Sequence, residues 1–110
     1  MKVVYSPICL NYFFPGHPES PDRIKLIYNE LCEDTRFEFV EPTRATENDL
    51  LLVHTQQLTS SVKNNTFLDN DTPNIKNIYD FALTSVGSAI MVAKLAEEKG
   101  VAFSLSCWQI

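Results

Sequence analysis

The sequence predicts an α/β protein whose small sheet is mostly parallel. Three short segments rich in β-branched and aromatic residues indicate strands, at Lys2–Ser6, Phe37–Val40 and Val101–Leu105. Helical patterns fill the chain between these segments, and this alternation favours parallel pairing because a parallel crossover usually needs a helix to return the chain. We therefore expect residues 1–110 to form a single unit in which at least three helices cover three strands.

The first helix is expected to begin at Pro21. Ser20 suits the N-cap, and Pro21 suits the first helical position because its missing N–H would be unpaired there anyway. Apolar residues then recur along one helical face, at Ile24, Ile27, Tyr28 and Leu31. The preceding segment, Asn11–Pro21, holds three prolines and one of the three glycines, which predicts a long loop. Long loops in compact domains are often functional.

Two short helices are predicted after the second strand. Thr46 can cap the first of them, and Asp49 stands at the position that completes a capping box. The helical pattern resumes after His54. The apolar residues of the two helices are Leu50, Leu51, Val53, Leu58 and Val62.

The longest helix is predicted from Ile75 to Lys99. A polar, turn-rich loop, Asn64–Asn74, precedes it, and Gly100 suits the position just past its end. Small residues dominate the middle of the helix, Ala82–Ala89, so we expect close packing on a sheet or another helix.

Composition excludes several classes of protein. The net charge of −5 and the pI near 4.9 argue against a protein that coats nucleic acid, which normally has a basic face. No apolar run approaches the roughly 20 residues needed to span a bilayer, and the N-terminus does not resemble a signal peptide. Three cysteines without CxxC spacing predict reduced thiols, and we expect a cytoplasmic location.

The sequence holds no HExxH, GxSxG, glycine-rich phosphate loop or paired-cysteine zinc motif. Its two histidines, His17 and His54, are far apart, whereas a catalytic zinc usually needs three protein ligands. His17 is either a loop residue paired with Glu19 or part of a pocket wall. His54 is expected to be a hydrogen-bonded structural residue, or one that eases the helix dipole, rather than a metal ligand.

Two charged residues have both structural and functional interpretations. Arg23 is a cation in the first turn of its helix, where it opposes the helix dipole. It forms either a solvated ion pair or a specific contact in a pocket, and we expect its guanidinium to turn inward toward His17 and Glu19. Asp71 precedes Thr72-Pro73 and is either an ordinary turn or cap residue or part of a binding loop.

The segment Pro15–Ile24, PGHPESPDRI, resembles the N-terminal signature of the histone deacetylase and acetylpolyamine amidohydrolase superfamily. Three further segments resemble family segments in the same order: Ala45–His54, Asp71–Pro73 and Gly100–Leu105. The resemblance covers about residues 2 to 105 and implies part of a three-layer α/β/α arginase-deacetylase-like fold.

The family reaction is zinc-assisted hydrolysis of an N-acetyl amide. By resemblance, Arg23 lines the internal channel beneath the pocket, Asp71 accepts hydrogen bonds from substrate amides at the rim, and His17 lies near the pocket. None of these residues would carry the chemistry. The resemblance therefore assigns pocket-supporting residues, no catalytic residue and no metal ligand to this sequence.

The sequence departs from the family after Leu105. The family continues there with tandem histidines, whereas residues 106–110 read SCWQI and form a divergent tail. We therefore expect an N-terminal fragment of a deacetylase, truncated before its zinc ligands, inactive alone and without a cofactor. Such a fragment would self-associate or need a complementing domain, with no nucleic acid or membrane as partner. The alternatives are a stand-alone, non-catalytic interaction module and a divergent hydrolase with an improvised metal site.

Overall fold

The computed structural model describes residues 1–11, 21–67 and 77–105. In chain order its elements are β1 (Lys2–Tyr5), the 3-10 helix η1 (Pro7–Asn11), α1 (Pro21–Leu31), β2 (Glu38–Val40), α2 (Glu47–Leu51), α3 (Gln56–Lys63), α4 (Ile78–Lys99) and β3 (Ala102–Leu105). All three predicted strands and all four predicted helices are present. The short helix η1 is an addition that the sequence pattern does not predict.

The strand β1 lies at the centre of a three-stranded parallel sheet with the order β2-β1-β3. Val3 faces Phe39 on one side and Phe103 on the other. Because β1 has neighbours on both sides, its residues are the most deeply buried of the sheet, and Val3 and Val4 are fully inaccessible to solvent. The prediction of a small, parallel sheet in an α/β fold is thus confirmed.

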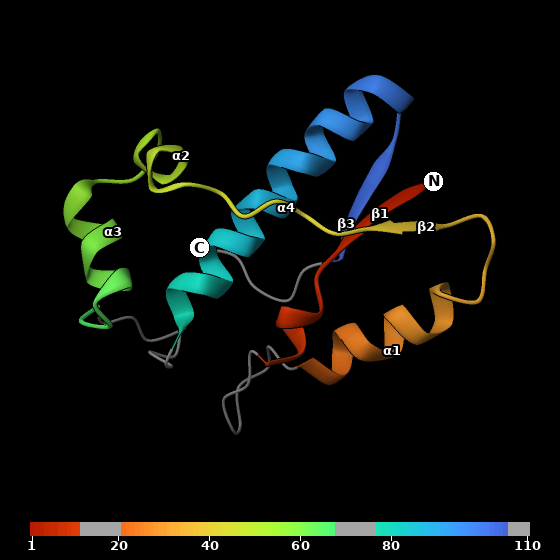
Figure 1. Ribbon diagram of the computed structural model, residues 1–110, viewed down its shortest axis with the longest axis horizontal. Helices are drawn as coiled ribbons and strands as arrows, with labels where there is room; N and C mark the ends of the chain where they lie inside the picture. Colours follow the sequence, from red (N-terminus) through yellow and green to blue (C-terminus); the bar gives the residue numbers. More distant parts are fainter. Residues whose placement is uncertain (12–20, 68–76, 106–110) are drawn as a thin grey trace.

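The order of the strands places the two crossover helices on opposite faces of the sheet. The chain moves from β1 to β2 through α1, and then passes back over β1 to reach β3 through α4. Parallel crossovers are right-handed in nearly all proteins, so two crossovers in opposite directions lie on opposite faces. Figure 1 shows α1 and α4 on opposite sides of the three strands. This is the α/β/α layering that the sequence predicts.

Three aromatic rings join α1 to the sheet. Tyr5 of β1 stacks on Tyr28 of α1 with ring centroids 4.4 Å apart. Phe39 of β2 meets the edge of Tyr28 at 4.9 Å. Offset stacking and edge contacts are the favourable arrangements for aromatic pairs, so this group fixes the position of α1 over β1 and β2.

The chain between β2 and α2 passes directly across α4 (Figure 1). The backbone N–H of Ala45 donates a hydrogen bond to the carbonyl of Leu83 at 3.0 Å. A Cβ atom on Gly87 would lie 2.0 Å from the carbonyl oxygen of Thr43, so only glycine permits this approach. The small residues predicted in the middle of the long helix therefore serve a close backbone contact.

By length and composition, α4 could also cross a membrane, since its most apolar 18-residue window has a mean hydropathy of 1.3. However, 44% of that window is buried inside the protein. The helix contacts β1 and β3, as the core helix of an α/β fold does.

The predicted caps of α2 and α4 are confirmed. The side chain of Thr46 accepts a hydrogen bond from the backbone N–H of Asp49, and the Asp49 carboxylate accepts one from the N–H of Thr46. These hydrogen bonds from Thr46 lower the pKa of Asp49. Gly100 ends α4 with a φ of 88°, a conformation that favours glycine.

We expect Gly87→Ala to destabilise the protein by about 1–3 kcal/mol or more, because the new methyl group would overlap the Thr43 carbonyl. Helix propensity alone predicts the opposite sign, a gain of about 0.5–1 kcal/mol. Urea denaturation monitored by circular dichroism distinguishes the steric loss from the gain in helix propensity. Ala89→Gly, at an exposed site of the same helix, is the control. A variant more stable than the parent would contradict the close approach.

We also expect acid to weaken the fold partly through Asp49. Its pKa is lower in the folded than in the unfolded chain, so its contribution is complete above its ordinary pKa of 3.8 and is lost as the pH falls below that value. Asp49→Asn should therefore flatten the loss of stability measured by urea denaturation between pH 5 and pH 2. Glu47→Gln in the same turn is the control, and an unchanged slope for Asp49→Asn would count against this role.

Candidate functional site

The carboxyl edge of the sheet is the place where open α/β sheets usually bind their ligands. Here β1 ends at Tyr5 and β3 ends at Leu105. The crossover helices run back against the strands, so α1 and α4 both begin at this edge. Because β2 is parallel to both and ends at the same edge, five chain segments meet there, three leaving strands and two entering helices.

A single hydrophobic cluster holds this edge together. It contains fully or nearly buried residues of β1, α1, α3, α4 and β3, with partly buried side chains from η1 and from the end of the α3 region packed against them. The members that flank the edge are Tyr5, Ile8, Leu10, Ile24, Phe67, Ile78 and Leu105. Ile78, at the first position of α4, is completely buried.

This cluster collects the ends of three segments that lie outside the described residues: 12–20, 68–76 and 106–110. Leu10 and Ile24 flank the first segment, Phe67 and Ile78 flank the second, and Leu105 precedes the third. Described residues that are remote in the sequence are thus packed in one region.

Of the three residues predicted to support a pocket, only Arg23 lies within the described part of the chain. His17 and Asp71 fall in the segments outside the described residues, so their predicted roles stay predictions. Arg23 lies in the first turn of α1, and its side chain is exposed. The residues toward which Arg23 is expected to turn, His17 and Glu19, fall outside the described residues, so its inward orientation stays a prediction.

The described residues do not fit a catalytic zinc. Within residues 1–11, 21–67 and 77–105, no three His, Cys, Asp or Glu side chains come close enough to hold a metal ion. His54 is half-buried in a pocket whose other walls are Leu50, Leu58, Thr59, Val62, Tyr79 and Ala82, and none of these is a good zinc ligand. The expectation that His54 is structural agrees with this environment.

A more open groove lies between the segment that follows β2 and the exposed side of α4. It has a volume of about 360 Å³, and Arg44 and Lys94 contribute its cations. A side-chain nitrogen of Arg44 pairs with the Asp80 carboxylate at 2.6 Å. Both partners are about half exposed, so this ion pair contributes little to stability.

The sequence prediction missed Thr59 as a residue of interest. Thr59 lies on the same face of α3 as Val62 and is almost fully buried. A polar residue on the apolar face of a predicted helix is a signal that could have identified it, because apolar residues at a spacing of three or four mark the buried face.

Comparison with known proteins shows a consistent similarity. A family described as the histone deacetylase domain matches residues 17–107. Over 94 residues the chain is 32% identical to a probable deacetylase from Archaeoglobus fulgidus, a match that covers 77% of this chain and 26% of that protein. The chain therefore spans about a quarter of the length of that curated relative.

Among solved structures, the chain resembles the crystal structure of the HDA15 HD domain. The TM-score is 0.81, and the match covers 96% of this chain and 36% of that chain. Because the sequence identity is 20%, this likeness shows the fold and no more.

Proposed function

Since the chain belongs to the histone deacetylase family, we propose that these 110 residues form the substrate-supporting part of a deacetylase-type site and do not hydrolyse acetylated amides by themselves. The observation that carries this proposal is the packing of Leu10, Ile24, Phe67, Ile78 and Leu105 in one cluster at the carboxyl edge of the sheet. In the sequence, His17 precedes α1 and Asp71 precedes α4, and Arg23 lies in the first turn of α1.

The proposed roles follow from the chemistry of the three side chains. The Asp71 carboxylate would accept hydrogen bonds from amide N–H groups of the substrate at the rim. The Arg23 guanidinium would bind a carboxylate such as the acetate product, for which its donors are suited. His17 would form part of the wall between them.

The metal chemistry of the family falls outside this proposal. Zinc in such an enzyme activates water and polarises the carbonyl group of the substrate. The described residues do not fit a zinc ion, so we assign them no step in bond cleavage. The proposed contribution of this chain is the binding and orientation of substrate.

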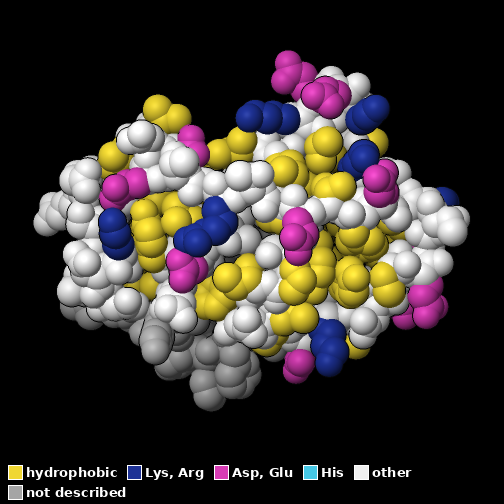
Figure 2. Space-filling model, viewed as in Figure 1, with side chains coloured by type: hydrophobic (Ala, Val, Ile, Leu, Met, Phe, Trp, Pro, Cys, Tyr) yellow, Lys and Arg dark blue, Asp and Glu magenta, His cyan; other side chains and the backbone are white. Residues whose placement is uncertain are grey.

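We further propose that the chain depends on additional polypeptide, either a complementing domain or a second copy. Its extents are 43 × 32 × 17 Å and its radius of gyration is 14.6 Å, compared with about 13 Å for a compact domain of this length. Parallel sheets are normally buried on both faces, yet Phe103 on β3 is 47% exposed. Figure 2 shows hydrophobic side chains gathered over the strands and α1.

The position of β3 at the edge of the sheet also supports the alternative function, a non-catalytic interaction module. Among the described strands, β3 pairs on one side only, and such an edge is a template for another strand. The two functions differ in whether the chain folds stably as a monomer. A monodisperse monomer that unfolds cooperatively with a stability above about 5 kcal/mol would favour the module.

We expect the purified chain, incubated with Zn²⁺, to show no turnover of an acetyl-lysine peptide or an acetylpolyamine. Its only histidines are His17 and His54, and a catalytic zinc usually needs three protein ligands. Release of acetate is the measurement. Zinc-dependent release that persists through purification and disappears in His17→Ala would contradict the proposal.

We expect Phe103→Lys to reduce self-association, because a charge on an exposed edge strand discourages strand pairing. Light scattering over a range of protein concentrations should show a lower mean mass than for the parent chain. Leu26→Lys, which places the same charge at an exposed site on α1, is the control and should behave like the parent. Equal effects of the two substitutions would remove β3 as the site of association.

A further inference from the structure

The two edges of the sheet differ in how well they are protected against a further strand. In and just after β2 stand Glu38, Glu41 and Pro42, and Glu38 forms an ion pair with Lys2 at 2.9 Å. Charges and proline discourage strand pairing at an edge. Residues 101–105, with the sequence VAFSL, contain neither a charge nor a proline. Among the described strands β3 pairs with β1 alone, so its outer side is an unprotected edge.

The largest exposed side chain of this edge lies on the face of the sheet that α1 covers. The register of β1 and β3 puts Tyr5 beside Leu105, and residues in register share a face. Phe103, two residues before Leu105, lies on that face as well. Tyr5 stacks on Tyr28 of α1 with ring centroids 4.4 Å apart, which identifies the face as the one against α1.

The helix α1 leaves the middle of β3 uncovered. Its Tyr28 ring contacts Tyr5 of β1 and Phe39 of β2 instead. Phe103 is consequently 47% exposed, and Val101, two residues earlier and directed to the same face, is 58% exposed. The edge of β3 therefore offers both unpaired backbone groups and adjacent apolar side chains to a partner.

A second copy of the chain suits this edge in charge and in symmetry. The chain has a net charge of −5, so two copies repel each other least where they meet through an uncharged segment. Identical subunits most often pair about a two-fold axis. An axis perpendicular to the sheet reverses the direction of β3, so the two strands run antiparallel and can form an antiparallel ladder.

The direction of the side chains selects the register of such a pair. Residues directly opposite each other in an antiparallel pair point to the same face. With Phe103 opposite Phe103 of the second copy, Val101 lies opposite Leu105. Ala102 then lies opposite Ser104. This register uses all of residues 101–105 and brings the exposed rings of the two copies side by side.

We propose that two copies of this chain associate through β3, antiparallel and centred on Phe103, to form one sheet of six strands, three from each copy. The inference rests on the proposed dependence of the chain on additional polypeptide, and it identifies that polypeptide as a second copy. Association covers Val101 and Phe103 and pairs the open edge of β3.

Charges placed at the centre of the pair test the partner and the register together. Light scattering of the parent chain should show a mean mass that approaches twice the 12.5 kDa of one chain as the concentration rises. Phe103→Lys and Phe103→Glu should each stay near the mass of one chain, because like charges would lie opposite each other. An equimolar mixture of the two variants should have a higher mean mass than either alone, because each lysine then lies opposite a glutamate.

Val101→Lys and Val101→Glu are the matched controls, because residue 101 lies opposite residue 105 rather than its own copy. Each should weaken association, and mixing them should not restore it. In the proposed register the two residues 101 lie about 13 Å apart along the strands. Physiological salt largely screens exposed charges at that separation.

Three outcomes would overturn the proposal: a folded parent chain that is monomeric at every concentration, association that both Phe103 variants retain, and a mixture of the Phe103 variants that stays at the mass of one chain. Circular dichroism shows whether each variant is folded.

Hydrogen exchange of the parent chain tests the same edge without a substitution. The amides of residues 101–105 should become more protected as the concentration rises, and protection that does not change would also overturn the proposal. Acetate release tests the substrate-supporting role separately, since turnover by the chain would contradict that role and leave the association unaffected.

Discussion

The fold depends on the pairing of one short strand on both of its sides. Four residues from Lys2 to Tyr5 supply the only strand that touches both of the other described strands. The first crossover starts at this strand and the second passes over it, so the position of β1 determines which face of the sheet each helix covers. Removing hydrogen bonds from β1 would separate β2 from β3, whereas loss at either edge would leave a sheet of two strands.

The central position of β1 also explains where the candidate site lies. Crossovers in opposite directions place α1 and α4 on opposite faces, but both helices must run back against the strands. Their first residues therefore meet at the carboxyl edge, where Ile24 and Ile78 pack with Tyr5 and Leu105. The described residues near the ends of segments 12–20 and 68–76 are packed at this edge, and this packing supports the proposed substrate-binding role.

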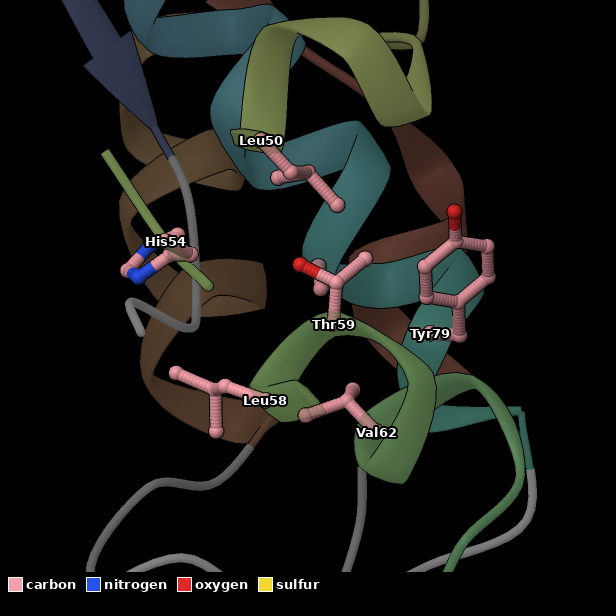
Figure 3. A pocket seen from close by; sticks show the side chains of 7 residues that line it. Leu50, His54, Leu58, Thr59, Val62 and Tyr79 are labelled. Carbon is pink, nitrogen blue, oxygen red and sulfur yellow. The ribbon is translucent and has the colours of Figure 1, made fainter. Parts of the chain in front are cut away.

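A second constraint operates between α4 and the chain that crosses it. The contact of Gly87 with Thr43, and the hydrogen bond from Ala45 to Leu83, join backbone to backbone without an intervening side chain. Such contacts are less tolerant of substitution than side-chain packing, because a carbonyl group cannot change its rotamer. By contrast, the pocket beside Thr59 is lined by side chains, which can change their rotamers (Figure 3).

The sequence by itself determined the features that depend on neighbours along the chain. The order of strands and helices, the capping box of Thr46 and Asp49, and the end of α4 at Gly100 follow from residues within one or two turns of each other. The family resemblance also rests on contiguous segments, and the match to residues 17–107 confirms it. Arg23, His17 and Asp71 could be selected from these segments, although their roles remain proposals.

Only the tertiary structure decided the features that join distant residues. The placement of β1 between β2 and β3, the passage of Thr43–Ala45 over Gly87, and the exposure of Arg23 depend on packing between elements. The near-complete burial of Thr59 belongs to the same group, because it depends on how α3 packs against other elements. Local patterns specify which elements form, but the strand order and the buried faces are set by the long-range contacts that remove the most apolar surface from water.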